Sequence, residues 1–279
     1  MFGCDYNPAC LEEFCENGTP VVFENIEAFA RWGTSTTHNQ VVDDVAQLCG
    51  GAGDTAALLV KRGYKDGPNY DIVVGIDHMR EDGRSYLRGY LRRRRPNIVL
   101  ISTPCTGMKG FSALNRAINH AAWVRCRRVS VPLGKLAGEV AYIQLRVGLH
   151  FIAEHPQGSA MFQLPIWKML SREPQVVKVL VHQCMTGLRG PRSGLPIKNP
   201  SEVWASDEEL VAPLRGLLCD GSHEHSQLDA REAGAPADKA KDAARWALPL
   251  CHRAARGSEH LLLKWLASST TSRLLTSPR

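Results

Sequence analysis

The sequence predicts an α/β fold with a doubly wound, mostly parallel sheet, followed by a small irregular C-terminal region. Between residues 41 and 102, short runs of Val, Ile and Leu alternate with helical segments in the order strand–helix–strand–helix–strand. The apolar runs are nearly continuous, as expected for parallel strands that are covered on both faces. Beyond about residue 185 the composition shifts toward Gly, Pro and polar residues, which indicates the irregular region.

Each element has its own signal. Strands are expected where apolar runs occur, at 41–48, 71–77, 97–102, 150–154 and 176–181. A first helix begins at Asp54 or Thr55, either of which can cap it, and stops at Gly63. Further helices are expected over 81–94, where Pro96 ends a basic segment, over 135–146 and over 238–256.

The predicted organisation follows from these elements. It comprises an N-terminal extension (1–40) and a core (41–182). A small irregular region that could contact nucleic acid (183–237), a helix that returns to the core (238–256) and a loosely attached tail (257–279) follow. No apolar stretch approaches the roughly 20 residues of a membrane span, and the N-terminus does not resemble a secretory signal. Nine scattered cysteines are typical of a reduced intracellular protein, and we expect a monomer.

The positive charge is concentrated in one part of the chain. Eleven of the 34 Lys and Arg residues lie between Arg84 and Arg128, a stretch without Asp or Glu, so the rest of the chain is net negative. One interpretation is a solvated basic helix, in which the run 92–95 suits the helix C-terminus. The other is a surface that binds a polyanion such as nucleic acid.

A glycine-rich turn and an acid at the end of a strand indicate a site for a bound ligand. Gly50, Gly51 and Gly53 stand between an expected strand and helix, where glycines let a nucleotide-like ligand approach the backbone. Asp77 ends the next expected strand, where an acid can bind ribose hydroxyls. Glycine is also needed in many turns solely for its backbone freedom, but the acid favours a cofactor site.

A cysteine and a glutamate follow two later strands. Cys105 lies in the loop Thr103-Pro104-Cys105-Thr106-Gly107, where Lys109 nearby could depress its pKa and make it a nucleophile. Taken alone, the residue is better explained as an inert buried thiol. Glu154 ends the strand at 150–154, where burial would hold it protonated as an acid, unless it forms a salt bridge with an arginine.

Together these motifs resemble the catalytic core of the DNA cytosine-C5 methyltransferases, in a divergent branch of the type found in mobile-element polyproteins. The likeness spans 41–256 and includes Phe111-Ser112 and the segment 246–251. It implies a Rossmann-like methyltransferase fold in which the glycine turn and Asp77 bind S-adenosylmethionine. It also implies that Cys105 attacks C6 of cytosine and that Glu154 contacts N3 and the exocyclic amine.

The resemblance implies DNA as substrate and a nuclear location if that holds; RNA is a further possibility. The sequence departs from the family's usual motifs at three positions. Thr103 replaces a proline, His155 replaces Asn, and Asp54 replaces an aromatic residue after the glycine turn. Arg189 is our candidate for the arginine near the target ring, with Arg192 beside it; the alternative is a surface loop whose arginines are solvated. The alternative function is a degenerate nucleic-acid-binding protein that has kept the fold and lost catalysis.

A possible metal site lies outside these motifs. Cys219, His223 and His225 form a compact trio that could bind zinc if folding brings Cys184 to it. The competing interpretation is a structural or nucleic-acid-contacting turn. We therefore assign no metal ligand among the predicted site residues. Whether these four residues bind zinc is left open.

Overall fold

A computed structural model describes residues 43–109, 116–190, 193–226 and 246–275, with side chains as far as residue 267. The strands are β1 Val45–Leu48, β2 Asp66–Tyr70, β3 Ile98–Ile101, β4 His150–Pro156, β5 Val177–His182 and β6 Pro200–Ala205. The α-helices are α3 Asp54–Lys61, α4 Glu81–Arg94, α6 His120–Arg146, α7 Pro165–Leu170, α8 Glu208–Val211 and α10 Leu248–Leu275. Short 3₁₀ turns are η1 Ile72–Val74, η2 Ala160–Gln163, η3 Gln183–Thr186 and η4 Ala212–Leu214.

The strands form one mixed sheet in the order β2-β1-β3-β4-β6-β5. β2, β1, β3 and β4 pair in parallel, whereas β6 is antiparallel to both of its neighbours. The α/β class is therefore confirmed, and the expectation of a mostly parallel sheet holds only for these first four strands. The strand order reverses between β1 and β3, and in open α/β sheets ligands bind beyond the carboxyl ends of the strands at such a point.

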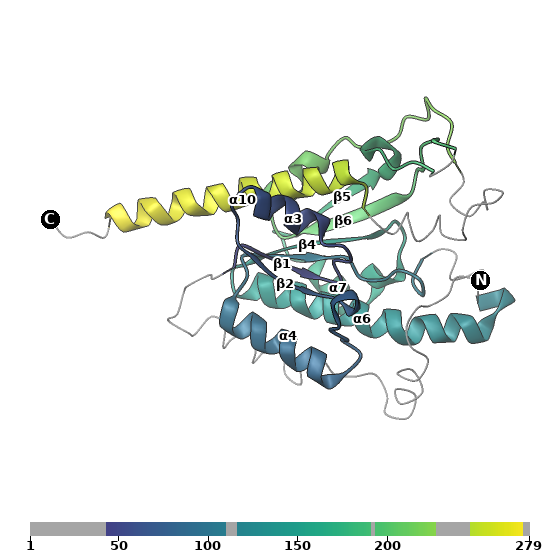
Figure 1. Ribbon diagram of the computed structural model, residues 1–279, viewed down its shortest axis with the longest axis horizontal. Coiled ribbons are helices and arrows are strands. Elements are labelled where there is room, and N and C mark those ends of the chain that lie inside the picture. Colours follow the sequence, from purple (N-terminus) through teal and green to yellow (C-terminus); the bar gives the residue numbers. More distant parts are fainter. Residues whose placement is uncertain (1–42, 110–115, 191–192, 227–245, 276–279) are drawn as a thin grey trace.

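Helices cover both faces of the sheet (Figure 1). Alternate residues of each strand pack on opposite sides: Val99 and Ile101 of β3 join a core with α4, α6 and α7, whereas Ile98 and Leu100 join a core with α3, α8 and α10. This double burial explains the nearly continuous apolar runs in the sequence. Among the described residues, no helix is both long and apolar enough to cross a membrane.

Several sequence predictions for single elements are confirmed. α4 spans the expected residues, with Glu81 and Asp82 in its first turn and arginines in its last, which suits the helix dipole. The expected strands that became β1, β3, β4 and β5 are present, and α6 contains the helix that was expected over 135–146.

Three predictions are wrong. The strand expected at 71–77 is replaced by β2 at Asp66–Tyr70, and η1 follows it. The region 183–237 is less irregular than expected, because it contributes β6 and α8. The helix that should end at 256 continues to Leu275 as α10, and burial of Leu261 and Leu262 attaches the expected tail to the core. The part of the expected helix at 238–245 lies outside the described residues.

Candidate functional site

The glycine turn lies at the carboxyl end of β1, next to the point where the strand order reverses. Gly51 and Gly53 have positive φ values of 55° and 75°, in the left-handed region that favours glycine. A Cβ on Gly50 would lie 2.8 Å from the Cβ of Gln47, so no larger residue fits there without a shift. A Cβ on Gly51 would meet nothing within 4 Å, so the outer side of the turn is open to a ligand.

The acid beside this turn is Asp71 rather than Asp77. Asp71 follows β2 directly, and its carboxylate accepts hydrogen bonds from the backbone N–H of Gly51 at 2.8 Å and of Val73 at 3.0 Å. Asp77 lies beyond η1 and accepts from the N–H of Met79 at 2.8 Å, a local turn contact. The assignment of Asp77 to the end of a strand is therefore wrong, because the strand ends seven residues earlier, at Tyr70.

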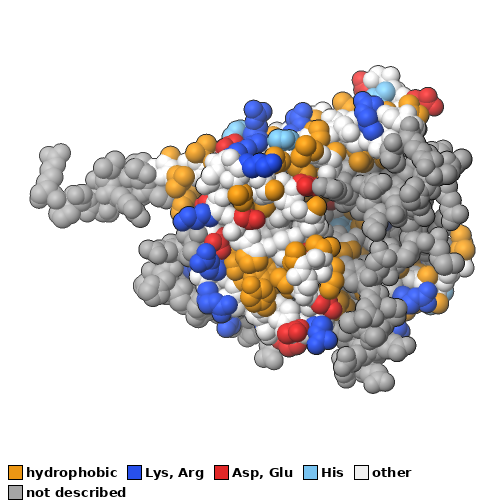
Figure 2. Space-filling model, viewed as in Figure 1, with side chains coloured by type: hydrophobic (Ala, Val, Ile, Leu, Met, Phe, Trp, Pro, Cys, Tyr) orange, Lys and Arg blue, Asp and Glu red, His pale blue; other side chains and the backbone are white. Residues whose placement is uncertain are grey.

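Apolar residues flank Asp71. Ile72, Val73 and Val74 are exposed, Val73 to 66%. Figure 2 shows hydrophobic side chains gathered over β2 and α4 on one face of the molecule, bordered by charged side chains. An apolar surface beside a glycine turn suits a ligand with a flat aromatic part.

The loop after β3 places Cys105 at the same edge of the sheet. The carbonyl of Cys105 accepts hydrogen bonds from the N–H of Met108 at 2.9 Å and of Lys109 at 3.1 Å, which closes the loop into one helical turn. Gly107 packs on α6, where its N–H donates to the hydroxyl of Ser130 at 3.1 Å. A Cβ on Gly107 would lie 2.9 Å from the backbone N of Arg127, so this contact requires glycine.

Glu154 lies on the neighbouring parallel strand. Ile101 of β3 pairs with Ala153 of β4, so the chain reaches Glu154 and the Cys105 loop at the same edge of the sheet. The indole Nε1 of Trp246 donates to Oε2 of Glu154 at 3.0 Å. Burial raises the pKa of Glu154, while hydrogen bonds from Ser201 and Trp246 and the charge of Lys109 oppose the rise. The direction agrees with the protonated acid that the sequence predicts.

The pKa of Cys105 moves in the direction opposite to the prediction. Burial raises the pKa of the thiol; Lys109 opposes the rise and Glu154 adds to it. The expected depression is therefore wrong, because burial outweighs the nearby cation. The same Lys109 also donates from Nζ to Oδ1 of Asn199 at 3.3 Å, which holds the cation beside both groups.

His155, next to Glu154, points to the other side of β4. It is 1% exposed, and its ring meets Phe162 edge to face at 6.2 Å. Burial lowers the pKa of His155 to about 4, against the effect of the carbonyls of Pro104 and Thr103. The neutral ring thus lies beneath the loop that carries Cys105, close to the carbonyls of Thr103 and Pro104.

The predicted arginine is not brought to this pair. Arg189 is exposed, and its guanidinium donates to the carbonyl of Gly194 in its own loop at 2.9 Å. Lys109 is the cation beside Cys105 and Glu154 instead. Arg192, Phe111 and Ser112 lie outside the described residues.

The basic block of the sequence divides between two parts of the molecule. Arg84 is buried and bonded to the carbonyl of Met79, and Arg94 pairs with Asp43 just before β1, at the amino edge of the sheet. Other members lie on a segment that we call the basic arm: Arg116, Arg125, Arg127 and Arg128, with Trp123 among them. Arg127 links this arm to the Cys105 loop, because its guanidinium donates to the carbonyl of Gly107 at 3.4 Å. Figure 1 shows the first turns of α6 projecting beyond the sheet. The guanidinium groups of Arg116 and Arg127 lie 5.4 Å and 5.3 Å from the Trp123 ring centroid.

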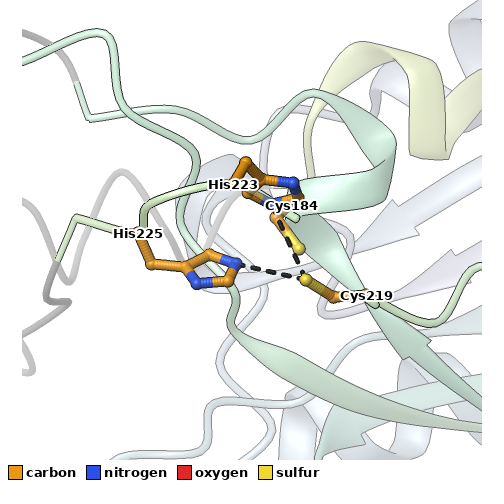
Figure 3. A group of neighbouring side chains, drawn as sticks. All are labelled: Cys184, Cys219, His223 and His225. Atoms are coloured by element: carbon orange, nitrogen blue, oxygen red, sulfur yellow. Dashed lines mark hydrogen bonds between the residues drawn. The ribbon is translucent and has the colours of Figure 1, made fainter. Parts of the chain in front are cut away.

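Four potential metal ligands meet near the end of β5. Cys184 lies in η3, and Cys219, His223 and His225 lie in a turn that follows η4. One donor atom from each lies within 4.8 Å of the others. Figure 3 shows the four side chains pointing toward one another. Folding therefore brings Cys184 to the trio, as the zinc interpretation requires.

Sequence reasoning missed Asp71 and the contact of Trp246 with Glu154. Asp71 stands at the start of the run Asp-Ile-Val-Val, which resembles a strand, so the acid was assigned to its far end. The sequence carries no signal for the Trp246 contact, because 92 residues separate the two partners. No family model, curated protein or solved structure matches this chain.

Proposed function

We propose that the protein is an S-adenosylmethionine-dependent methyltransferase that acts on C5 of cytosine in DNA through a covalent adduct with Cys105. The observation that carries the proposal is the placement of Cys105 in the loop after β3 and of Glu154 on the adjacent strand β4, one residue beyond the parallel pairing, close enough for Glu154 to influence the pKa of the thiol. A nucleophile and an acid at the carboxyl edge, beside the reversal of strand order, suit attack on a bound ring.

The chemistry assigns a role to each group. The Cys105 thiol loses its proton to a base or solvent water, and its sulfur forms a bond to C6. The electron pair of the C5=C6 bond shifts into the ring, and Glu154 donates its proton to N3 and becomes a carboxylate. S-adenosylmethionine, when bound, would supply the methyl group to C5. A base then removes the C5 proton, the Cys105 thiolate leaves C6 as the C5=C6 bond re-forms, and N3 returns its proton to Glu154.

The raised pKa values fit this sequence of steps. A protonated Glu154 is the form that donates to N3, and burial favours that form. The thiolate is disfavoured before substrate arrives, but Lys109 lies beside it and would stabilise the anion as it forms. Lys109 is therefore proposed as the group that assists ionisation of Cys105.

The open outer side of Gly51 supports a cofactor site at the glycine turn. Asp71, which follows β2 and is buried, anchors this turn by accepting from the N–H of Gly51, and it is the proposed acid for the ribose hydroxyls. The exposed side chains of Ile72 and Val73 would contact the purine ring. Gly50, Gly51, Gly53 and Asp71 are therefore the proposed cofactor residues.

The basic arm supports DNA as the substrate. Arg125 and Arg128 are exposed, and Gly107 packs directly on this part of α6, so phosphate groups held there would lie next to the Cys105 loop. A base must leave the duplex stack before a thiol can reach its ring, and backbone contacts would offset the few kcal/mol required.

Covalent trapping on DNA that contains 5-fluorocytosine tests the proposal. Fluorine at C5 blocks the final elimination, so the wild-type chain should form an adduct that survives denaturation and depends on S-adenosylmethionine. Cys105→Ser should form none, whereas Cys15→Ser, which keeps Cys105 and removes another of the nine thiols, should form it normally. Trapping by Cys105→Ser would contradict the proposed nucleophile.

A second candidate is a nucleic-acid-binding protein that has kept the fold and lost catalysis. Two observations favour it: burial raises the pKa of Cys105, and Arg189 contacts its own loop rather than the pair. This candidate predicts that DNA and S-adenosylmethionine bind, as calorimetry would show, while the wild-type chain forms no trapped adduct. Preference for a structured RNA over DNA in the same assays would indicate an RNA substrate.

A further inference from the structure

We propose that Cys184, Cys219, His223 and His225 bind one Zn²⁺ ion, which fastens the segment after η4 to the end of β5. The site is independent of the proposed methyl transfer, because none of its residues takes part in that chemistry. Two cysteines and two histidines form a donor set typical of structural zinc, and thiolate ligands select zinc over magnesium or calcium.

The distances between donor atoms suit tetrahedral coordination. Sγ of Cys219 lies 3.7 Å from Nε2 of His223 and 3.4 Å from Nε2 of His225. With zinc bonds of about 2.3 Å to sulfur and about 2.1 Å to nitrogen, neighbouring donors in a tetrahedron lie about 3.3–3.8 Å apart. The His223 and His225 rings reach Cys219 from the same turn, with centroids 4.6 Å apart. Small side-chain adjustments would complete the geometry.

The backbone around Cys219 supports its role as a ligand. The N–H of Gly221 donates to Sγ of Cys219 at 3.4 Å, a contact that favours the thiolate. The N–H of Cys219 donates to Nδ1 of His182, the last residue of β5, at 2.9 Å. Gly221 has a φ of 80°, which lets the chain reverse so that His223 faces Cys219. These contacts hold the turn in one conformation.

Four protein ligands indicate a structural ion rather than a catalytic one. A catalytic zinc keeps one position open for water or substrate, whereas this cluster supplies all four donors. The apolar cluster nearby is small: Leu188 and Ile197 are its buried members, with Ala247 packed against them. Such a cluster holds the neighbouring loops weakly, so the metal would add stability to η3 and to the turn at 219–226.

The residues near the proposed zinc site also contact the surroundings of Cys105 and Glu154. Ala247, next to Trp246, packs on Leu188 and Ile197, and Trp246 donates to Glu154. Asn199, from the same region, accepts the hydrogen bond from Lys109. Loss of zinc would therefore disturb both contacts, although the ion touches neither residue.

Metal content is the first test. The chain is purified without added metal and then dialysed. Inductively coupled plasma mass spectrometry should then find about one zinc ion per molecule. Cys219→Ser and His225→Ala should lower zinc affinity more than about 100-fold, since even loss of an outer contact lowers it about 10–100-fold. Cys126→Ser and His252→Ala, which alter the same residue types outside the cluster, should keep the full content.

X-ray absorption of the wild-type chain is the second test, and it does not depend on the variants folding. We expect two sulfur and two nitrogen neighbours around zinc, and cobalt replacement should give the intense visible bands of a tetrahedral thiolate site. A wild-type chain that takes up no zinc, or a spectrum with oxygen or nitrogen donors only, would overturn the proposal. The proposed methyl transfer is judged separately by adduct trapping, so either proposal can fail alone.

Discussion

The indole of Trp246 donates a hydrogen bond to the carboxylate of Glu154 at 3.0 Å, although 92 residues separate the two in the sequence. Trp246 stands two residues before α10, whose first turns contain the buried residues Leu250 and Cys251. The C-terminal helix is thus attached to the strand end that carries the proposed acid. The protonation of Glu154 depends in part on how this helix is seated.

Trp246→Phe tests this link. The hydrogen bond from Trp246 lowers the pKa of Glu154, so its removal should raise that pKa further. If protonated Glu154 is the active form, the loss of methyl transfer at high pH should move to higher pH in a pH–rate profile. Trp265→Phe, on the outer part of the same helix, should leave the profile unchanged. A shift to lower pH would contradict the assignment.

Gly107→Ala should impair the site without unfolding the protein. The new Cβ would meet the backbone of Cys126 and Arg127 at 2.9 Å, so the Cys105 loop would have to move away from α6. We expect at least a roughly 100-fold loss of adduct formation, since misplacement by about 1 Å has effects of this size.

Gly89→Ala is the matched control. Its Cβ meets the flexible guanidinium of Arg93 within α4, and alanine favours the helix. Equal trapping by Gly107→Ala and the wild-type chain would show that the loop does not need its present position.

Glu139 should make stability depend on pH. Burial raises the pKa of Glu139 to about 7, with Lys135 opposing the rise, and Oε2 has no hydrogen-bond partner among the described residues. Because the folded pKa is raised, its contribution to stability is complete below the unfolded value near 4.5 and is lost as the pH rises through about 7.

Glu139→Gln should remove this dependence. Unfolding by urea at pH 5 and pH 8 would measure it, and the wild-type chain should lose roughly 1–3 kcal/mol more than the variant over that interval. An identical loss in both chains would show that Glu139 is paired in solution.

Leu262→Ala tests whether the outer part of α10 belongs to the fold. Leu262 is 1% exposed and packs in the core with α3 and α8, so its truncation should lower the free energy of unfolding by about 2–5 kcal/mol. Leu263→Ala, at a side chain that is 53% exposed, should change it by less than about 0.5 kcal/mol. Equal effects of the two substitutions would contradict the seating of this helix.

The parallel half of the sheet could be predicted because each of its elements has a local signal. β3 and β4 are apolar runs, and α4 is bounded by acids at its start and Pro96 after its end. β6 has no such signal, because Pro200-Ser201-Glu202 offers no apolar run and only the three consecutive residues 203–205 are apolar. Its place between β4 and β5 is set by pairing across the sheet, which the local sequence does not encode.

The site was predictable to the same extent. Cys105 follows one recognisable strand and Glu154 lies near the end of another, so their placement at one edge could be inferred. The direction of the Cys105 pKa could not, because it depends on how deeply folding buries the thiol. The run after Asp71 is apolar enough to be a strand but is exposed as η1, because β2 has already paired with β1 through the preceding residues.

The position of β6 also constrains the order in which the sheet can be completed. β5 is made before β6, yet β5 pairs only with β6, which in turn pairs with β4. During synthesis β4 therefore keeps an open edge, and β5 has no strand to join, until residues 200–205 leave the ribosome. Open apolar edges promote association between chains. A pause in translation before residue 200 would hold the nascent chain in its most aggregation-prone form.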